Sequence, residues 1–348
     1  MATKQDYRIV LVLAGGNALG AYQAGVYQAL QEHGIEPDWV VGASVGANNG
    51  AVIAGNAPEQ RLPNLVDLWR PETPAMGWPG WWDSMPDSWR RTSEAIGTLL
   101  VGRPGLFAPL GSSLIGVSSS IPALFDTSPM SGTLEQLVDF DRLNTGPVRF
   151  TATAVDLDTG EDVAFDTRDR TVGAEHIRAS AALAPSFPAV EIDGQMFVDA
   201  GLSANLPLDP VLSEPPTAPT LCIAIDLLPL AGARPDTLGE VIGRAQDLVF
   251  ACQSRRTIAR WQELYAISEA HRAHPVTLVR LAYGNQQREV AGKAMDFSPT
   301  SVRYRWDSGY RDGVDLARRL DDGSITVSGS GLTVLQPSHE AQAFHTST

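Results

Sequence analysis

The first fifty residues alternate between apolar runs and helical patterns. Residues 8–13 (RIVLVL) form an uninterrupted apolar run rich in β-branched side chains that stops before two glycines, which predicts a buried strand entering a tight turn. Apolar residues within 18–32 then recur on one helical face, and Gly34 is a suitable stop. A second strand is expected at 39–41, followed by a helix of small residues. This alternation predicts an α/β fold with a mainly parallel sheet covered by helices on both faces.

The same pattern returns after residue 148. A hairpin near 159–161, a helix over 174–183 and a strand that ends at Asp199 are expected there. Further along, the expected elements are a strand at 220–228, a helix over 238–272, a strand at 276–281 and a helix that begins at Ser298-Pro299, where a capping side chain precedes proline. Past Arg319 the chain becomes rich in Gly, Ser and Thr, which predicts a flexible tail over 323–348.

The stretch from about 71 to 129 departs from this alternation. It is rich in Pro, Gly, Ser and Trp, and it contains Trp78, Trp81, Trp82 and Trp89. We interpret it as an irregular, cap-like insertion. Tryptophan prefers membrane interfaces, so residues 76–89 could form a peripheral membrane contact; the alternative is that these side chains fill a secondary core. The expected organisation is a single domain over 7–322, with core motifs in 8–210 and a C-terminal extension over about 236–322.

Composition and charge exclude several classes of protein. A formal net charge of −14 and a pI near 4.8 argue against nucleic-acid binding, which needs a basic face, and against docking to anionic lipid by charge alone. The two cysteines, Cys222 and Cys252, lack the spacing of a disulfide framework or a metal site. No apolar stretch resembles a signal peptide or a membrane span, so we expect a cytoplasmic protein with at most peripheral membrane contact.

The first candidate for chemistry is the sequence Gly42-Ala43-Ser44-Val45-Gly46, a G-x-S-x-G pattern between an expected strand and an expected helix. In that setting the backbone turns sharply and projects the serine hydroxyl from a strained bend, while Gly42 and Gly46 avoid Cβ clashes. The positive end of the dipole of the following helix points at the same place. We therefore expect Ser44 to be a nucleophile; the alternative is an ordinary turn between a strand and a helix.

The second candidate is the glycine-rich loop at 15–20 (GGNALG), directly after the first strand. Free N–H groups in such a loop bind an anion, either a dinucleotide pyrophosphate or the oxyanion of an acyl-transfer intermediate. The dinucleotide motif fails because Asn17 occupies the place of its second glycine. We favour an oxyanion hole formed by the N–H groups of Gly15, Gly16 and Asn17; a close-packed turn without a ligand is the alternative.

The third candidate is Asp199, which ends an apolar strand and precedes Ala200-Gly201. Open α/β sheets place active sites at the carboxyl ends of strands, although an aspartate that caps a turn is the commoner use on position alone. No histidine follows it in a recognisable loop, as the Ser–Asp–His order of ordinary α/β-hydrolases requires. The six histidines are His33, His176, His271, His274, His339 and His345. Only His176 is retained as a candidate third member.

Together these segments resemble the patatin-like phospholipase family over 8–210. The matching residues are Gly15, Gly16 and Gly20 in the loop, Gly42, Ser44 and Gly46 in the elbow, and Asp199 and Gly201 in the third motif. The sequence departs from the family pattern where Asn17 and Ala200 replace glycines and where Leu19 stands in place of a common Arg or Lys. The C-terminal part, with FSPTSVRYRWDSGYRDG, is similar to an extension found in a bacterial subgroup of the family.

The resemblance implies a three-layer α/β/α fold and a Ser44–Asp199 dyad that needs no metal and no organic cofactor. Because a free aspartate has a pKa of about 3.9, a useful base requires a desolvated Asp199 with a raised pKa, within hydrogen-bond reach of Ser44. We expect a serine lipid acyl hydrolase of the phospholipase or esterase type, whose substrate is a lipid or another acyl ester. The alternatives are an acyltransferase with the same dyad and a non-catalytic lipid-binding module.

Overall fold

The computed structural model describes residues 7–70, 86–110, 123–284, 286, 289–290, 292–337 and 344–346. Its centre is a sheet with the strand order β12-β11-β10-β9-β1-β2-β5-β8-β7, and β6 also pairs with β5. The strands that run parallel are β11 (Leu332–Pro337), β10 (Val276–Ala282), β9 (Thr220–Asp226), β1 (Arg8–Leu13), β2 (Trp39–Ala43) and β5 (Arg149–Asp156). The antiparallel strands are β6 (Asp162–Asp166), β7 (Val190–Ile192), β8 (Gln195–Asp199) and β12 (Phe344–Thr346). The predicted mainly parallel sheet is confirmed.

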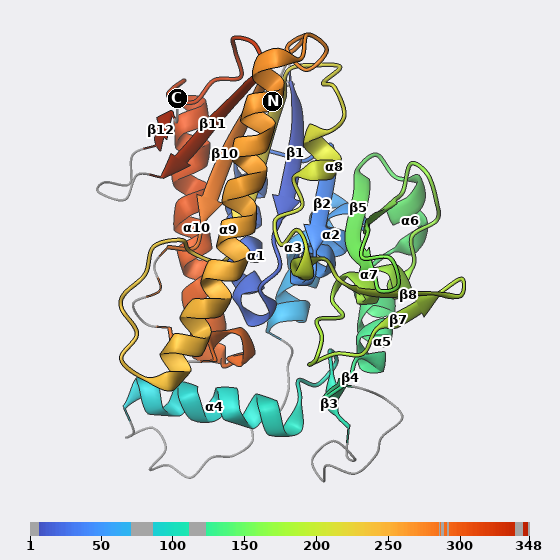
Figure 1. Cartoon of the computed structure of the whole chain (residues 1–348), viewed down its shortest axis with the longest axis vertical. Coiled ribbons are helices and arrows are strands. Elements are labelled where there is room, and N and C mark those ends of the chain that lie inside the picture. The colour runs from blue at the N-terminus through green and yellow to red at the C-terminus, as the bar shows by residue number, and fades with distance from the viewer. Residues whose placement is uncertain are drawn as a thin grey trace.

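Helices cover both faces of this sheet because side chains alternate along each strand. Ile9, Leu11 and Leu13 of β1 point into one core, while Val10 and Val12 point into the other. The first core is closed by α1 (Ala21–Glu32), α2 (Val45–Ala54), α3 (Pro58–Trp69) and α10 (Pro299–Asp321), and the second by α8 (Asp209–Leu212) and α9 (Leu238–Ile267). Figure 1 shows α9 and α10 on opposite sides of the strands, which confirms the three-layer α/β/α fold.

Three helices differ from their predicted bounds. The helix expected over 174–183 is α7 (Ala174–Ser180), which ends three residues early. The pattern over 18–32 divides into a 3-10 turn, η1 (Asn17–Gly20), and α1. The helix expected over 238–272 ends at Ile267, because the next residue, Ser268, has an extended backbone. The described part of the chain contains no helix with both the length and the apolar character that a membrane crossing needs.

The flexible tail predicted over 323–348 is wrong for much of its length. Leu332–Pro337 forms β11, which pairs in parallel with β10, and Phe344–Thr346 forms β12 beside it. Ile325 is buried in the core on the α10 side of the sheet, and Val334 is buried in the core on the α9 side. The prediction followed the Gly- and Ser-rich composition of this segment. A short apolar run within the segment is nevertheless enough to form a strand that extends the sheet.

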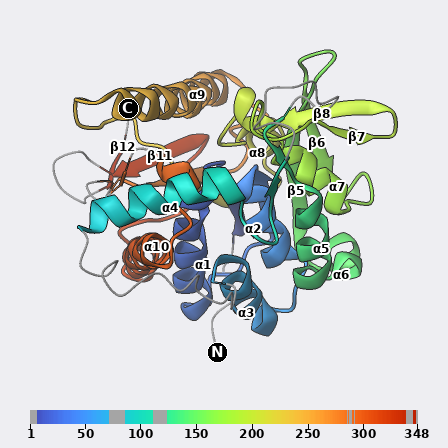
Figure 2. The same cartoon turned by 90° about the horizontal axis from the view of Figure 1, so that it is seen from below.

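The irregular insertion predicted over 71–129 contains regular structure where the chain is described. Asp87–Val101 forms a 15-residue helix, α4, and it is followed by a short pair of strands, β3 (Ala108–Pro109) and β4 (Phe125–Asp126). Trp89 is 66% exposed, whereas Trp78, Trp81 and Trp82 lie outside the described residues. Figures 1 and 2 show α4 running across the molecule at the carboxyl ends of the parallel strands. Helix α4 therefore lies over any site that is formed at the carboxyl ends of these strands.

The C-terminal extension is joined closely to the rest of the fold. Helix α10 packs on α1 at backbone contact, because glycines stand where the two helices meet. A Cβ atom at Gly25 of α1 would lie 2.0 Å from the carbonyl oxygen of Trp306, and one at Gly309 of α10 would lie 2.0 Å from that of Tyr22. Any larger side chain at either position must push the two helices apart.

We expect Gly309→Ala to lower the free energy of unfolding by about 3 kcal/mol, because a methyl group cannot fit between α10 and α1. The measurement is denaturant unfolding followed by circular dichroism. Gly243→Ala, in the exposed part of α9 where nothing lies within 4 Å, is the matched control and should leave stability unchanged or raise it. Equal stability of the two variants would contradict backbone contact between the helices.

Candidate active site

Strand register brings Ser44 and Asp199 to the same level of the sheet. In the parallel pairing of β2 with β5, Ala43 lies opposite Thr153, so Ser44 follows at the level of Ala154. In the antiparallel pairing of β5 with β8, Asp199 lies opposite that same Ala154. Because β6 pairs with the other edge of β5 over both stretches, β2 and β8 share one edge and meet there end to end, with Ser44 after the end of β2 and Asp199 at the end of β8. The prediction that Asp199 ends a strand is confirmed. That strand, β8, runs antiparallel to β5, and its pairing with β5 places Asp199 beside Ser44.

Ser44 occupies a strained turn between β2 and α2. Its backbone angles are φ 55° and ψ −126°, a region that non-glycine residues rarely adopt. The flanking glycines permit the turn, since a Cβ at Gly42 would lie 2.4 Å from the carbonyl oxygen of Gly46, and one at Gly46 would lie 2.2 Å from that of Leu13. The Ser44 N–H donates to the main-chain and hydroxyl oxygens of Ser180, at 3.1 and 3.0 Å. These contacts hold the serine in the geometry expected of a nucleophile elbow.

The Asp199 carboxyl group is buried, with 1% of the residue exposed. Its Oδ1 accepts a hydrogen bond of 2.7 Å from the Gly201 N–H, while Oδ2 has no hydrogen-bond partner in the described part of the chain. Burial raises the pKa of Asp199 to about 6, and the nearby Ser44 hydroxyl and the Gly201 N–H offset part of the rise. The Ser44 hydroxyl is therefore close enough to lower the pKa of Asp199, but the two groups do not form a hydrogen bond of ordinary length. Such bonds are often long before a substrate is bound.

The glycine-rich loop differs from its prediction at one position. Gly15 donates its N–H to the carbonyl oxygen of Asn205 at 3.0 Å, so it is not free to bind an oxyanion. Within the described residues, the N–H groups of Gly16 and Asn17 donate to no acceptor. Asn17 has φ 49°, a left-handed conformation that asparagine tolerates better than most residues. The expected set of three amide donors in this loop is therefore reduced to two.

Two residues that sequence reasoning missed hold the loop against the aspartate. The buried Asn205 donates its side-chain amide to the carbonyl oxygen of Gly15 at 3.1 Å. Gln253 of α9 accepts from the Asn205 N–H at 3.0 Å and donates to the Gly201 carbonyl at 3.1 Å. A polar side chain six residues after Asp199 was the one available signal for Asn205. Gln253 carried none, since it lies within an ordinary helical pattern.

These groups open onto a cavity of about 290 Å³. Ser44, Asp199, Gly16 and Asn17 line it at one side. Much of the remaining wall is apolar and comes from several elements: Leu99 of α4, Leu106, Phe107, Met130, Phe187 and Phe250. A larger cavity, of about 410 Å³, lies between α3, α4 and the start of α10, and no residue of the three motifs lines it. The cavity at Ser44 has the shape and polarity of a site for an apolar chain with a reactive polar end.

His176 does not join Ser44 and Asp199. Its Nδ1 accepts from the Gly173 N–H at 3.0 Å, and its ring packs edge-on against Phe165 at 4.7 Å. No histidine with a described side chain lines the cavity; His339 and the side chain of His345 fall outside the described set. Nor do the described residues include a group of three or more His, Cys, Asp or Glu side chains that could hold a metal ion. The candidate catalytic set is therefore the pair alone.

Comparison with known proteins places this chain in a family. A family model described as patatin-like phospholipase matches residues 11–212, and a second, described as patatin phospholipase, matches residues 242–321. An uncharacterized NTE family protein of Mycobacterium tuberculosis is 28% identical over 243 residues, which cover 68% of this chain and 55% of that protein. The chain thus spans about half the length of the curated relatives it matches. Lysophospholipase nte1 of Aspergillus terreus is 53% identical over 47 residues, 14% of this chain and 3% of that protein.

Two solved structures are also similar. VipD from Legionella pneumophila has 16% identity and a TM-score of 0.45, covering 91% of this chain and 67% of that one. The type III effector ExoU of Pseudomonas aeruginosa has 14% identity and a TM-score of 0.39, covering 91% and 54%. The family assignment itself depends on the first sequence match, which spans more than half of the chain and contains all three motifs. This chain belongs to the patatin-like phospholipase family.

Proposed function

We propose that this protein hydrolyses ester-linked acyl chains of lipids, with Ser44 as the nucleophile and Asp199 as its general base. The observation that carries the proposal is that the strained Ser44, just after the end of β2, and the buried Asp199, at the end of β8, meet at the same edge of β5. An apolar cavity at this pair suits an acyl chain. Membership of the family supports the same class of reaction.

The proposed reaction begins when Asp199 accepts the proton of the Ser44 hydroxyl as its oxygen attacks the ester carbonyl carbon. The tetrahedral intermediate collapses, the leaving alcohol takes the proton from Asp199, and an acyl-enzyme remains. Asp199 then accepts a proton from water, whose oxygen attacks the acyl carbon. Release of the fatty acid returns the proton to Ser44. A raised pKa suits this role because the carboxylate then holds the proton more firmly in each transition state.

The negative oxygen of the intermediate would be bound by main-chain amides. Gly16 and Asn17 supply two free N–H groups beside Ser44, and both residues line the cavity. Val45 is a third donor, from outside the glycine-rich loop. It is the first residue of α2, where N–H groups lack an intrahelical acceptor, and it also lines the cavity. Each such donor is worth roughly 3–4 kcal/mol in comparable sites.

We also propose that the 71–129 insertion acts as a cap within one catalytic domain over 7–322. Leu99 of α4, together with Leu106 and Phe107, contributes part of the cavity wall. Other apolar side chains of α4, including Trp89 and Leu100, are exposed and could rest on a lipid surface. The rest of the proposed membrane contact, 76–85, lies outside the described residues.

Ser44→Ala should abolish hydrolysis of p-nitrophenyl esters, with a loss of at least about 10³-fold in kcat, because the nucleophile is removed. A series of esters from short to long acyl chains identifies the preferred chain length. Ser203→Ala is the matched control, since this exposed serine bonds Asp162 and lies outside the cavity. A folded Ser44→Ala variant with wild-type activity would show that another group is the nucleophile.

The rate of ester hydrolysis should rise with pH and level off above an apparent pKa of about 6. Asp199 can accept a proton only when it is ionised, and burial keeps it protonated at lower pH. The measurement is kcat/KM between pH 4.5 and 8 with a substrate that does not titrate. A midpoint near 4 would mean that Asp199 is solvated during turnover or is not the base.

Asp199→Asn should be inactive and yet more stable than wild type at pH 7. A pKa raised from 3.8 to about 6 means that the folded state binds this proton more tightly than the unfolded state. The associated stability is present below pH 4 and is lost as pH rises through 6, which amounts to about 3 kcal/mol. Thermal unfolding at pH 7 should therefore favour the variant, and the difference should vanish at pH 4. A variant that is less stable at both values would contradict a costly buried carboxylate.

A further inference from the structure

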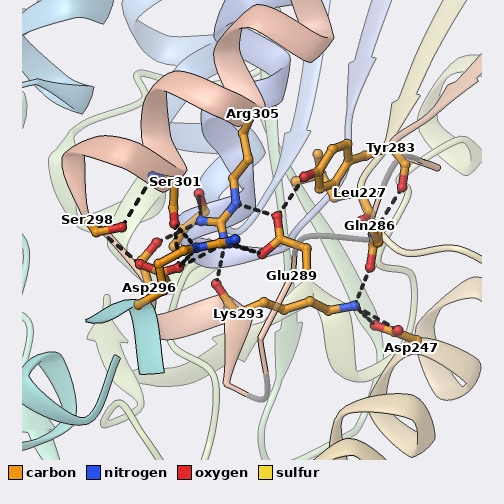
Figure 3. Close-up of polar contacts among 12 residues, drawn as sticks. Leu227, Asp247, Tyr283, Gln286, Glu289, Lys293, Asp296, Ser298, Ser301 and Arg305 are labelled. Carbon is orange, nitrogen blue, oxygen red and sulfur yellow. Dashed lines mark hydrogen bonds and ion pairs between the residues drawn. The ribbon is translucent and has the colours of Figure 1, made fainter. Parts of the chain in front are cut away.

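Arg305 of α10 is a buried arginine with every N–H group bonded. The residue is fully buried, and its guanidinium has five N–H donors. Two donate to Glu289, at 2.9 and 2.7 Å. The other three donate to main-chain carbonyl oxygens of Ala18, Lys293 and Asp296, at 3.0, 3.0 and 2.7 Å. Figure 3 shows Arg305 at the centre of this set, with Glu289, Lys293 and Asp296 around it.

The arginine belongs to a cluster of four buried charges. Arg91 of α4 pairs with Glu289 and Asp296, at 3.1 and 3.2 Å, and Arg305 pairs with the same two acids. Burial alone would raise the pKa of Glu289, but the hydrogen bonds and charge of Arg305 hold it below its usual value. Burial would lower the pKa of Arg305, and Glu289 reverses that effect. Both members of the pair are therefore charged at neutral pH.

A buried cluster of this kind is a weak source of stability, because removing the charges from water costs several kcal/mol. Its clearer consequence is geometric, since each bond fixes one segment relative to another. Residues from three parts of the chain converge here: the cap helix through Arg91, the loop before α10 through Glu289 and Asp296, and α10 itself. The bond to Ala18 adds a fourth segment, the glycine-rich loop.

Ala18 follows the two residues whose N–H groups are free beside Ser44. Its carbonyl oxygen is held by Arg305, and the side-chain amide of Asn17 donates to the sulfur of Met295 at 3.4 Å. Met295 lies between Lys293 and Asp296, whose carbonyl oxygens Arg305 also binds, and it lines the cavity. The Arg305 guanidinium thus fixes the glycine-rich loop relative to the segment 293–296, which carries Met295 of the cavity wall.

We infer that Arg305 is a positioning residue, through which the C-terminal extension aligns the Gly16 and Asn17 amides with the developing oxyanion. The inference rests on the proposed function and assigns the extension a part in that same site. A displacement of about 1 Å in such donors costs on the order of 100-fold in rate. Losing the alignment should weaken binding of the transition state and leave binding of the uncharged ester almost unchanged.

The test compares Arg305→Lys with wild type on a p-nitrophenyl ester and on two inhibitors of equal chain length. Lysine keeps the charge but has three donors on one nitrogen, so it cannot hold Glu289 and all three carbonyls. We expect kcat per titrated active site to fall about 10- to 100-fold while KM stays within about threefold. The inhibition constant of a trifluoromethyl ketone, which forms a tetrahedral adduct with serine, should rise by the same factor. That of the matching alkane, which forms none, should not change.

Arg318→Lys is the matched control, because Arg318 lies on the same helix with its side chain 61% exposed and pairs only with surface acids among the described residues. It should leave all four quantities unchanged. If Arg305→Lys loses thermal stability while kcat per active site and both inhibition constants stay at wild-type values, Arg305 is merely structural and the inference is overturned.

Should Arg305→Lys not fold, Glu289→Gln replaces it. Glutamine keeps the shape of Glu289 but removes the charge that holds two of the five N–H groups, so a smaller fall in kcat at constant KM is expected, and unchanged kcat would refute positioning. Ser44→Ala is measured in parallel. If wild type neither hydrolyses the ester nor binds the trifluoromethyl ketone more tightly than Ser44→Ala does, the proposed function itself has failed; if wild type does both, any failure concerns Arg305 alone.

Discussion

The candidate site depends on one edge of β5, where two strands that run in opposite directions meet end to end. β2 is parallel to β5 and ends beside Thr153, whereas β8 is antiparallel and ends beside Ala154, so the carboxyl ends of both strands meet on the edge of β5 that faces away from β6. Were β8 parallel to β5 at the same place, its amino end would face β2, and Asp199 would lie at its far end, away from Ser44. Asp199 ends its strand in the cavity that α4 helps to line, where burial raises its pKa. The proximity of the strained serine to the desolvated acid follows from that pairing.

Much of this could be predicted from the sequence, for local reasons. Strands buried on both faces read as continuous apolar runs, and this located β1, β2 and β9. The three motifs were recognisable because each occupies a few adjacent residues with glycine where backbone must approach backbone. Hydrogen bonds between segments that are distant in the sequence have no comparable local sequence pattern. The bond from Gly15 to Asn205, which removes one expected oxyanion donor, joins residues 190 positions apart. Similarly, no pattern within α9 indicated that Gln253 would contact the loops around Asp199.

The two regions matched by family models form one body. α10 meets α1 through glycines, and β10 continues the sheet begun by β9 and β1. The buried charges around Arg305 then join the extension to the glycine-rich loop and to α4. Two kinds of contact therefore join the extension to the core. The close backbone packing of α10 on α1 holds the helices together without depending on particular side chains. The ionic cluster instead fixes one arrangement of its segments, the one in which every charge has a partner.

The strand β11 has a consequence for how copies of this protein behave beside one another. β10 would otherwise end the parallel part of the sheet with a row of unsatisfied N–H and C=O groups, flanked by apolar side chains such as Leu278. An edge of that kind is a template for strands from other molecules, and it invites aggregation. A few residues beyond α10 occupy it instead. The segment that composition alone marks as dispensable therefore covers this edge, and proteolysis there would expose the pairing groups of β10 while leaving Ser44 and Asp199 in place.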